Sequence, residues 1–173
     1  MINSYSRTRR TRILTALLLS SAAASAWAWE AGRMTGGGSI ICKGPAYRVT
    51  FGYELHCQLD KQPISTPNNL EVNFSTGTHF HLTALNQAEC SGQNTTHPDA
   101  GFNQIAGFGT GRLDGQPARI EFKLVDNAEP GAGADQAFFR ITTGSNNEEV
   151  LNCGPTVLEG GNNQAHRATG NKQ

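Results

Sequence analysis

The chain has 173 residues, of which 20 are glycine, four are cysteine, 14 are basic and 14 are acidic. Four of the arginines but none of the acidic residues lie within residues 1–28. The rest of the chain therefore keeps 10 basic against 14 acidic side chains, a formal net charge of −4. Nucleic-acid-binding proteins carry a basic surface, so this balance excludes nucleic acid as an expected partner. The length suits one domain with a core of its own.

Residues 1–28 are typical of a secretory signal peptide. Arginines at positions 7, 9, 10 and 12 precede an apolar and small-residue stretch, and Ala26 and Ala28 then match the small-x-small cleavage pattern. The apolar stretch is too short to span a bilayer comfortably, so we expect no stable membrane anchor after cleavage. The pattern predicts an exported protein, in the bacterial periplasm or outside the cell, whose mature part begins at Trp29.

All the cysteines lie in the mature part, at Cys42, Cys57, Cys90 and Cys153. An even number of cysteines in an exported chain predicts two disulfides, and four cysteines allow three connectivities. No two of them are spaced as CxxC, the arrangement that zinc knuckles and thioredoxin-like sites use. We interpret all four as structural cross-links.

The longest strand signal runs over residues 46–60, where apolar and polar side chains alternate. A period of two places one set on a buried face and the other on a wet face, as in an antiparallel sheet. Gly52, which lacks a side chain, predicts a bend or bulge in this strand. Before the strand, the glycine triplet at 36–38 predicts a turn that leads into a short apolar segment.

Residues 70–85 carry the clearest hairpin signal. A three-residue loop over 75–77, with Gly77 in a left-handed conformation, pairs Val72 with Phe80 on the apolar face. The same register leaves two polar pairs on the wet face, Glu71 with His81 and Asn73 with His79.

Short strand signals then alternate with turns rich in glycine, proline and asparagine. Strands are expected over residues 104–114, 118–125 and 136–143 and within 150–159. Glycines at 107, 109 and 111 leave one face of the first of these bare, which allows another sheet, an aromatic ring or a ligand to pack closely.

No segment of helical length has a clean period of 3.6 residues. Short strands separated by turns predict a single all-β domain over residues 29–159, either an antiparallel β-sandwich or a partly closed barrel. Residues 160–173 have almost no apolar side chains, and we expect them to form a flexible C-terminal tail.

Polar side chains gather on the wet face of the predicted hairpin. His79 and His81 are two residues apart on one strand and point the same way, with Glu71 facing them from the other strand. His56, on the preceding strand, is a fourth candidate. These side chains could ligate a transition metal, or they are surface residues that alternate with core residues, and both interpretations stay open.

An oxygen-rich loop over residues 126–135 is the second candidate metal site. Its carboxylates, Asp126, Glu129 and Asp135, are of the type that ligates calcium. Their spacing does not match the EF-hand, and Asp and Asn also occur in turns because they bond to nearby backbone groups. Calcium is thus the one cofactor that this loop suggests, and an ordinary turn is the alternative.

Five short sequence boxes are spread over the mature chain: GRMTGGGS (32–39), ELHC (54–57), PNNLEVNF (67–74), DNAEPGAGAD (126–135) and GGNNQAH (160–166). Together they resemble a group of secreted, uncharacterised bacterial β-rich domains of the post-COAP-like type. In that group the acidic loop reads D-x-G-E-P-G and the last box GNHQAH, so Ala128 and Asn163 are departures. The resemblance implies export and a β architecture, and it implies no catalytic residue.

The cysteine positions suggest a pairing. Cys57 lies on the apolar face of the long strand, so its partner must approach the core. Cys90 follows the hairpin that is expected to pack beside that strand, and the resembling boxes place both in the same half. We predict Cys57–Cys90 and Cys42–Cys153. The rival pairing, Cys42–Cys57 with Cys90–Cys153, stays open.

Two functions remain at this point. The first is an exported, non-enzymatic domain that is structural or binds a surface, a glycan or a protein partner. The second is a metal-dependent enzyme that uses the histidine face. No G-x-S-x-G motif is present and no carboxylate pair can be assigned to glycoside hydrolysis, so we favour the first.

Overall fold

The computed structural model describes residues 31–43, 47–57, 67–74, 77–93 and 100–167. Over these residues the secondary structure is strand, with no helix. None of them forms a helix that could cross a membrane. The nine strands are β1 (Gly32–Ile41), β2 (Arg48–Cys57), β3 (Asn69–Phe74), β4 (His79–Ser91), β5 (Gln104–Leu113), β6 (Gln116–Val125), β7 (Gln136–Thr143), β8 (Glu148–Val157) and β9 (Gly160–Arg167).

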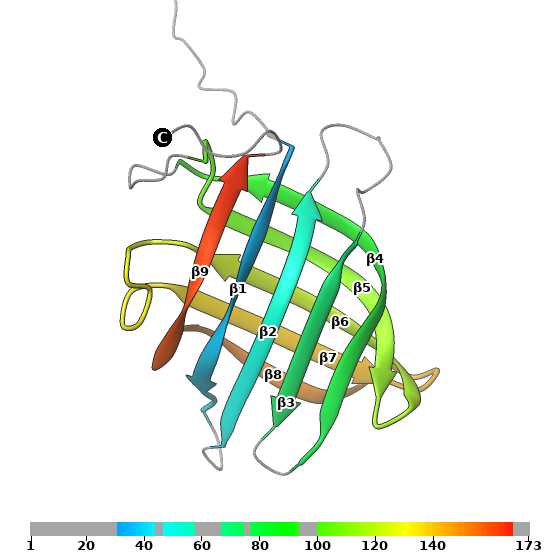
Figure 1. Ribbon diagram of the computed structural model, residues 1–173. Coiled ribbons are helices and arrows are strands. Elements are labelled where there is room, and N and C mark those ends of the chain that lie inside the picture. The colour runs from blue at the N-terminus through cyan, green and yellow to red at the C-terminus, as the bar shows by residue number, and fades with distance from the viewer. Residues whose placement is uncertain (1–30, 44–46, 58–66, 75–76, 94–99, 168–173) are drawn as a thin grey trace, which may run out of the picture.

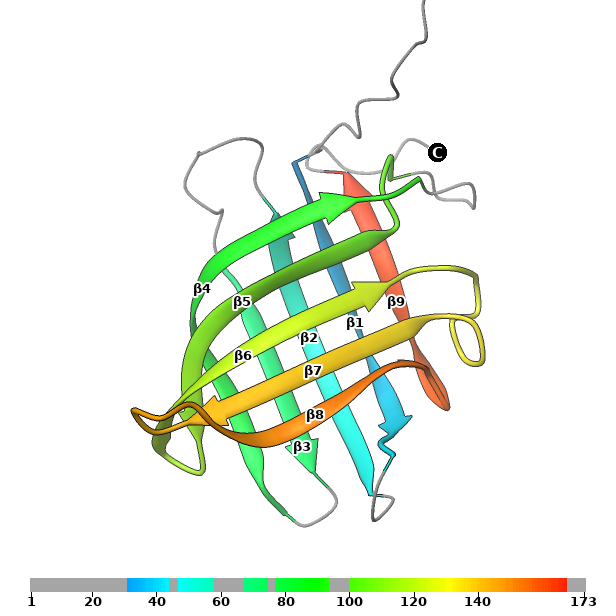
Figure 2. The same ribbon diagram turned by 180° about the vertical axis from the view of Figure 1, so that it is seen from behind.

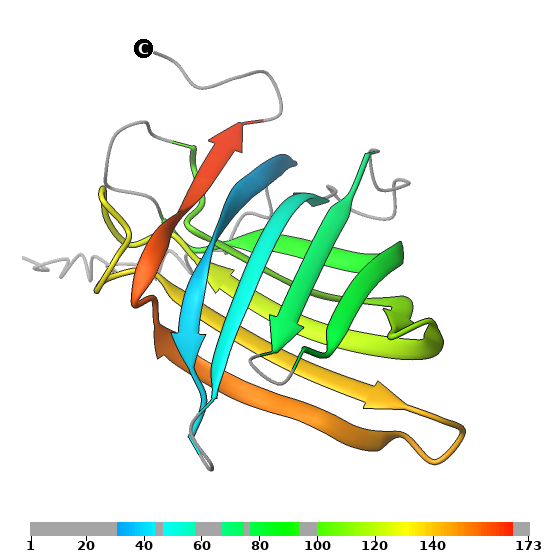
Figure 3. The same ribbon diagram turned by 60° about the horizontal axis from the view of Figure 1, so that its bottom comes forward.

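The strands form one antiparallel sheet in the order β8-β7-β6-β5-β4-β3-β2-β1-β9. The sheet curls so that β9, β1, β2 and β3 lie over β5 to β8 (Figure 1), which form the opposite layer (Figure 2). Seen from below, the curl is a half-barrel (Figure 3), and buried apolar side chains fill the space between the layers. The all-β prediction is confirmed, and the architecture is the partly closed barrel rather than two separate sheets.

Strand β4 connects the two layers and bends to do so. Its pairing with β5 shifts register between Leu82 and Ala84 and again between Leu85 and Gln87. Such irregularities bend a strand and increase its local twist. Only the first part of β4 pairs with β3, over residues 79–81, whereas β5 pairs with β4 from Phe80 to Ser91. Gly52, where a bend or bulge was predicted, lies in unshifted ladders on both sides, so it forms no bulge.

The glycines of β5 explain how the curled layer packs. A Cβ built on Gly107 would lie 2.1 Å from the carbonyl oxygen of Gln87, at the β4 irregularity. At Gly111 a Cβ would meet the Phe80 ring at 2.5 Å. The bare face predicted for this strand therefore receives the backbone of β4 and a buried aromatic ring, and that prediction is confirmed.

The core is made by the alternating apolar sets that define each strand. Val49, Phe51, Tyr53, Leu55 and Cys57 of β2 are all buried, and the residues between them are not. Phe51 reaches across to Phe139 of β7, with ring centroids 5.0 Å apart, so the two layers share one core. The hairpin register is also confirmed, because Glu71 pairs with His81, Val72 with Phe80 and Asn73 with His79. Gly77 has a φ of 92°, as its loop position requires.

Both predicted disulfides are present. Cys57 and Cys90 join the end of β2 to the end of β4, and Cys42 and Cys153 join the end of β1 to β8. The second bridge links residues that are 111 apart in sequence. It ties β8, an edge strand of the sheet, to the end of β1 in the opposite layer. Two structural disulfides indicate an oxidising environment.

Two other sequence predictions are wrong. The glycine triplet Gly36, Gly37 and Gly38 lies inside β1 and not in a turn, because β2 and β9 approach β1 so closely that there is no room for side chains. A Cβ on Gly38 would lie 2.4 Å from the carbonyl oxygen of Gly160. The expected C-terminal tail is strand β9 over residues 160–167, paired with β1 along its length. Residues 1–30 and 168–173, which include the predicted signal peptide and the rest of that tail, lie outside the described residues.

Candidate functional site

The predicted histidine face exists as an exposed cluster on β3 and β4. The His79 Nε2 atom lies 2.6 Å from one oxygen of Glu71, and the His81 Nδ1 atom contacts the other. Each carboxylate oxygen of Glu71 thus already binds one imidazole. All three side chains are partly exposed, as in a solvated surface cluster.

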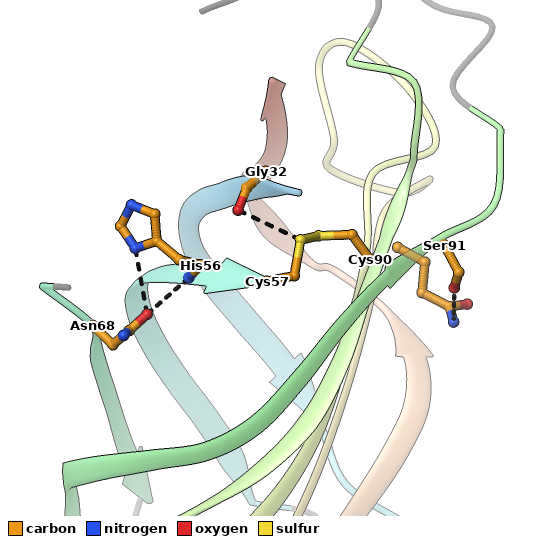
Figure 4. Close-up of a disulfide and its surroundings, with 7 residues drawn as sticks. Gly32, His56, Cys57, Asn68, Cys90 and Ser91 are labelled. Carbon is orange, nitrogen blue, oxygen red and sulfur yellow. Dashed lines mark hydrogen bonds between the residues drawn. A yellow bond between two sulfur atoms is a disulfide. The ribbon is translucent and has the colours of Figure 1, made fainter. Parts of the chain in front are cut away.

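His56 does not join this cluster. It lies near the end of β2, where its backbone N–H donates to the Asn68 side chain at 2.8 Å and its ring lies beside the same amide oxygen (Figure 4). Its neighbour in the chain is the disulfide-bonded Cys57, which faces the other way, into the core. Among the described residues, no group of three or more His, Cys, Asp or Glu side chains is arranged to hold a metal ion.

The predicted calcium loop, residues 126–135, packs against β9. Asp135 is completely buried, and its Oδ1 atom accepts the backbone N–H groups of Asn127 at 2.8 Å and Ala128 at 3.2 Å. Its Oδ2 atom accepts the N–H of Asn163, on β9, at 2.7 Å. One carboxylate therefore folds its own loop and fixes that loop to the last strand. We call this contact between the loop and β9 the seam.

Asp126 makes the second carboxylate contact of the seam. Its Oδ2 atom accepts the backbone N–H of Ala165 at 3.0 Å, two residues beyond Asn163 on β9. Asp126 is 3% exposed, and its Oδ1 atom has no hydrogen-bond partner. Burial raises the pKa of Asp126 to about 6, the hydrogen bond from Ala165 opposes this shift, and the nearby Asp135 and Glu129 charges add to it.

A buried polar pair completes the seam. The Asn163 amide accepts the Tyr53 hydroxyl at 2.9 Å and donates to the carbonyl oxygens of Val125 and Gln136, both at 3.0 Å. Both of its N–H donors are thus used, and its oxygen accepts one bond. Burial, followed by the charges of Asp135 and Asp126, raises the pKa of Tyr53 well above its ordinary value.

The seam gives the acidic loop a structural explanation. An edge strand leaves a row of backbone N–H groups unpaired, and here the two carboxylates accept two of them from β9. Glu129, the third predicted calcium ligand, instead accepts the Asn162 side-chain amide at 3.0 Å. The boxes at 126–135 and 160–166 are therefore two halves of one contact, and all three carboxylates bind protein groups.

Substitution of Asp126 by asparagine tests the cost of this buried acid. An acid whose pKa is raised by folding contributes stability below its unfolded pKa, near 4, and loses it as pH rises to about 6. The free energy of unfolding of the wild type, relative to D126N, should fall by about 2 kcal/mol between pH 4 and pH 7. Urea unfolding at both pH values measures this. A difference that does not change with pH would contradict the assignment.

A groove lies on the other side of the molecule, on the outward face of β5, β6 and β7, the layer that faces the viewer in Figure 2. It consists of a cavity of about 850 Å³ that continues into one of about 400 Å³. The two cavities share four polar residues: Thr110, Arg119, Thr142 and Asn147. We call the combined space the outer groove.

The ladder places the groove side chains in two rows. Thr110, Arg119 and Thr142 lie directly opposite one another on β5, β6 and β7. Two residues along these strands, the next row holds Phe108, Glu121 and Arg140. Phe108 is 46% exposed, although aromatic residues in this fold otherwise lie mainly in the core.

The charges of the second row are largely paired. Arg140 donates to Glu149 at 2.8 Å and to Glu121 at 3.2 Å. The hydrogen bond from Arg140 lowers the pKa of Glu149, and those two glutamates raise the pKa of Arg140. In the first row, Arg119 takes part in none of the ion pairs among the described residues.

Sequence reasoning did not identify the outer groove. Its signal was the composition of β5, where Phe108 and Thr110 occupy the positions that alternate with the glycines. Because the glycine face is the inner one, the aromatic side chain must point outward. The seam residues do not line either cavity of the outer groove, so the groove is the better candidate for binding. Comparisons of this chain with protein-family models, with curated proteins and with solved structures give no match.

Proposed function

We propose that this protein is an exported binding module and that its outer groove takes a glycan. The observation that carries the proposal is the position of an exposed phenylalanine beside a groove lined by hydroxyl, amide and guanidinium groups. The cavity volumes lie in the range of small-molecule sites. A sugar presents both a C–H face that packs on an aromatic ring and hydroxyls that need polar partners.

The groove is also built on a rigid support. Its two rows of side chains project from three paired strands whose inner faces pack in the core, and the turns that join these strands to their neighbours complete the wider cavity. A site on strands loses little conformational entropy when a ligand binds. The cavities combine hydroxyl, amide and guanidinium groups with apolar surface, which suits a ligand that has both hydroxyls and C–H faces, such as a glycan.

The cellular setting is part of the same proposal. We propose that residues 1–28 direct export and that the protein acts in the bacterial periplasm or outside the cell, where extracytoplasmic glycans occur. The two disulfides support export.

Membership of the post-COAP-like group also stays a proposal, supported by the contact between two of its boxes at the seam. The alternative of a metal-dependent enzyme has no observation in its favour among the described residues.

A glycan-binding screen with substitutions at two aromatic positions tests the proposal. Phe108→Ala removes the exposed ring of the groove, and affinity for any glycan that binds the wild type should fall at least about tenfold. Phe138→Ala is the matched control, because Phe138 is on the outward face of β7 but lines neither cavity. Failure of every glycan to bind, or binding by F108A with the affinity of the wild type, would overturn the proposal.

A further inference from the structure

The three arginines of the outer groove differ in what their guanidinium groups bind. Arg140 is shared by two glutamates, and Arg112 donates to the Gly115 carbonyl at 3.1 Å. Arg119 has neither an ion pair nor a side-chain hydrogen bond among the described residues. It is also the arginine that lines both cavities and stands at their junction, with Asn147 on the same boundary.

We propose that the outer groove is specific for an acidic glycan, with a sugar carboxylate bound by Arg119 and the sugar ring packed on Phe108. This inference rests on the proposed function and names the class of ligand. A guanidinium group presents a planar fork of N–H donors that matches a carboxylate in a bidentate arrangement. An arginine with no acidic partner of its own is free to take that carboxylate from a ligand.

The ladder gives this pair of contacts a suitable spacing. Arg119 lies opposite Thr110, and Phe108 is two residues before Thr110 on β5. Diagonal neighbours of this kind are about 7–8 Å apart in an antiparallel sheet, and both side chains lean over the same face. One monosaccharide with its carboxylate spans this separation. The hydroxyls of Thr110 and Thr142, directly opposite Arg119 on both sides, supply donors and acceptors for the oxygens of the sugar.

The charge of the rest of the protein makes Arg119 distinctive. The chain after residue 28 has a formal net charge of −4, so a general attraction for anions is not expected. Glu121, which is two residues from Arg119 on β6, is bound by Arg140 and so is held in the neighbouring row. Arg112, the other groove arginine without an ion pair, is held by the Gly115 carbonyl, so recognition of an anionic sugar where the two cavities meet depends on Arg119.

Calorimetric titration with matched sugars tests the inference. The probes are oligomers of galacturonic, glucuronic and mannuronic acid, each compared with its neutral counterpart of equal length. The wild type should bind at least one oligouronate, and bind it at least about tenfold more tightly than the neutral oligomer. Arg119→Ala should remove this preference, since a charge-assisted hydrogen bond contributes about 1.5–3 kcal/mol, or about 10–100-fold in affinity. Arg119→Lys should restore part of it.

Lys123→Ala is the matched control. Lys123 also lies on the outward face of β6 and carries the same charge, but it lines neither cavity, so its removal should leave affinity unchanged. Equal loss in K123A and R119A would reveal unspecific attraction and overturn the inference. Equal binding of acidic and neutral sugars, with an effect of F108A, would overturn the acidic specificity and leave the proposed function standing. Binding of no saccharide, or of a protein partner in place of one, would overturn both.

Discussion

Replacement of Cys42 and Cys153 by alanine is expected to lower the free energy of unfolding by about 4–5 kcal/mol. The bridge closes a loop of 111 residues, and the loss of chain entropy on cross-linking rises with the logarithm of loop length. Native domains have only about 5–15 kcal/mol of stability, so the double variant should be close to its folding threshold. Guanidinium unfolding of the oxidised wild type and of the variant measures the difference.

The second disulfide supplies the comparison. Cys57 and Cys90 are 33 residues apart, which gives an expected loss of about 3–4 kcal/mol for their double alanine variant by the same relation. The Cys42–Cys153 bridge should therefore be the more important of the two. If removal of Cys42–Cys153 lowers the free energy of unfolding clearly less than removal of Cys57–Cys90, loop length does not determine how much each bridge stabilises this fold.

Asp135→Asn is expected to destabilise the protein by about 3–5 kcal/mol. The two carboxylate oxygens of Asp135 accept three backbone N–H groups, and the residue is completely buried. An asparagine has a single acceptor oxygen, so its amide N–H₂ must face at least one backbone donor. Lost bonds to a charged acceptor and an unpaired buried donor each contribute a few kcal/mol. Urea unfolding at pH 7 gives the value.

Glu129→Gln is the matched control within the same loop. Glu129 binds the Asn162 side chain in a more exposed position, and the change should cost less than about 1 kcal/mol. The Glu129→Gln variant also tests the hypothesis that the loop binds calcium. Because the seam carboxylates already accept protein donors, millimolar calcium should not raise the melting temperature above its value in EDTA. A rise that is present in the wild type and absent in E129Q would support calcium ligation by the loop instead.

The sequence was most informative where a strand pattern and its turn are local. The alternation over residues 70–85 and the need for a left-handed Gly77 fix the hairpin register, because a shift by one residue would expose the apolar face. This inference requires only near neighbours in the chain and the period of a strand. The disulfide pairs needed more: the period placed Cys57 on the core face, the hairpin and the resembling boxes placed Cys90 near it, and the other two cysteines remained as the second pair.

The seam and β9 were beyond such reasoning. The residues of β9 are polar, yet the strand forms because β1 provides a ladder and two buried carboxylates accept its outward N–H groups. The alternation of apolar and polar side chains cannot reveal a strand that is held by its backbone hydrogen bonds. The glycine triplet in β1 was misleading for a related reason, because glycine marks close backbone approach as well as turns.

The outer groove shows a third limit. Arg119 lies 9 residues after Thr110 and 23 residues before Thr142 in the chain. Only the register of three strands brings these residues into one row. Their residue types are ordinary for a wet face, so nothing in the sequence distinguishes them from other surface residues. The exposed Phe108 is the single unusual member, and its outward direction could be read from the alternation with glycine.

Amide chemical shifts of ¹⁵N-labelled protein, followed during titration with the tightest-binding oligouronate, show directly whether the outer groove is the binding site. We expect the shifted amides to cluster on β5, β6 and β7 around Thr110, Arg119 and Thr142. A site in the groove also requires little change in β9 and in the histidine cluster of Glu71, His79 and His81. Shifts confined to the seam or to that histidine cluster, with the groove amides unmoved, would contradict it.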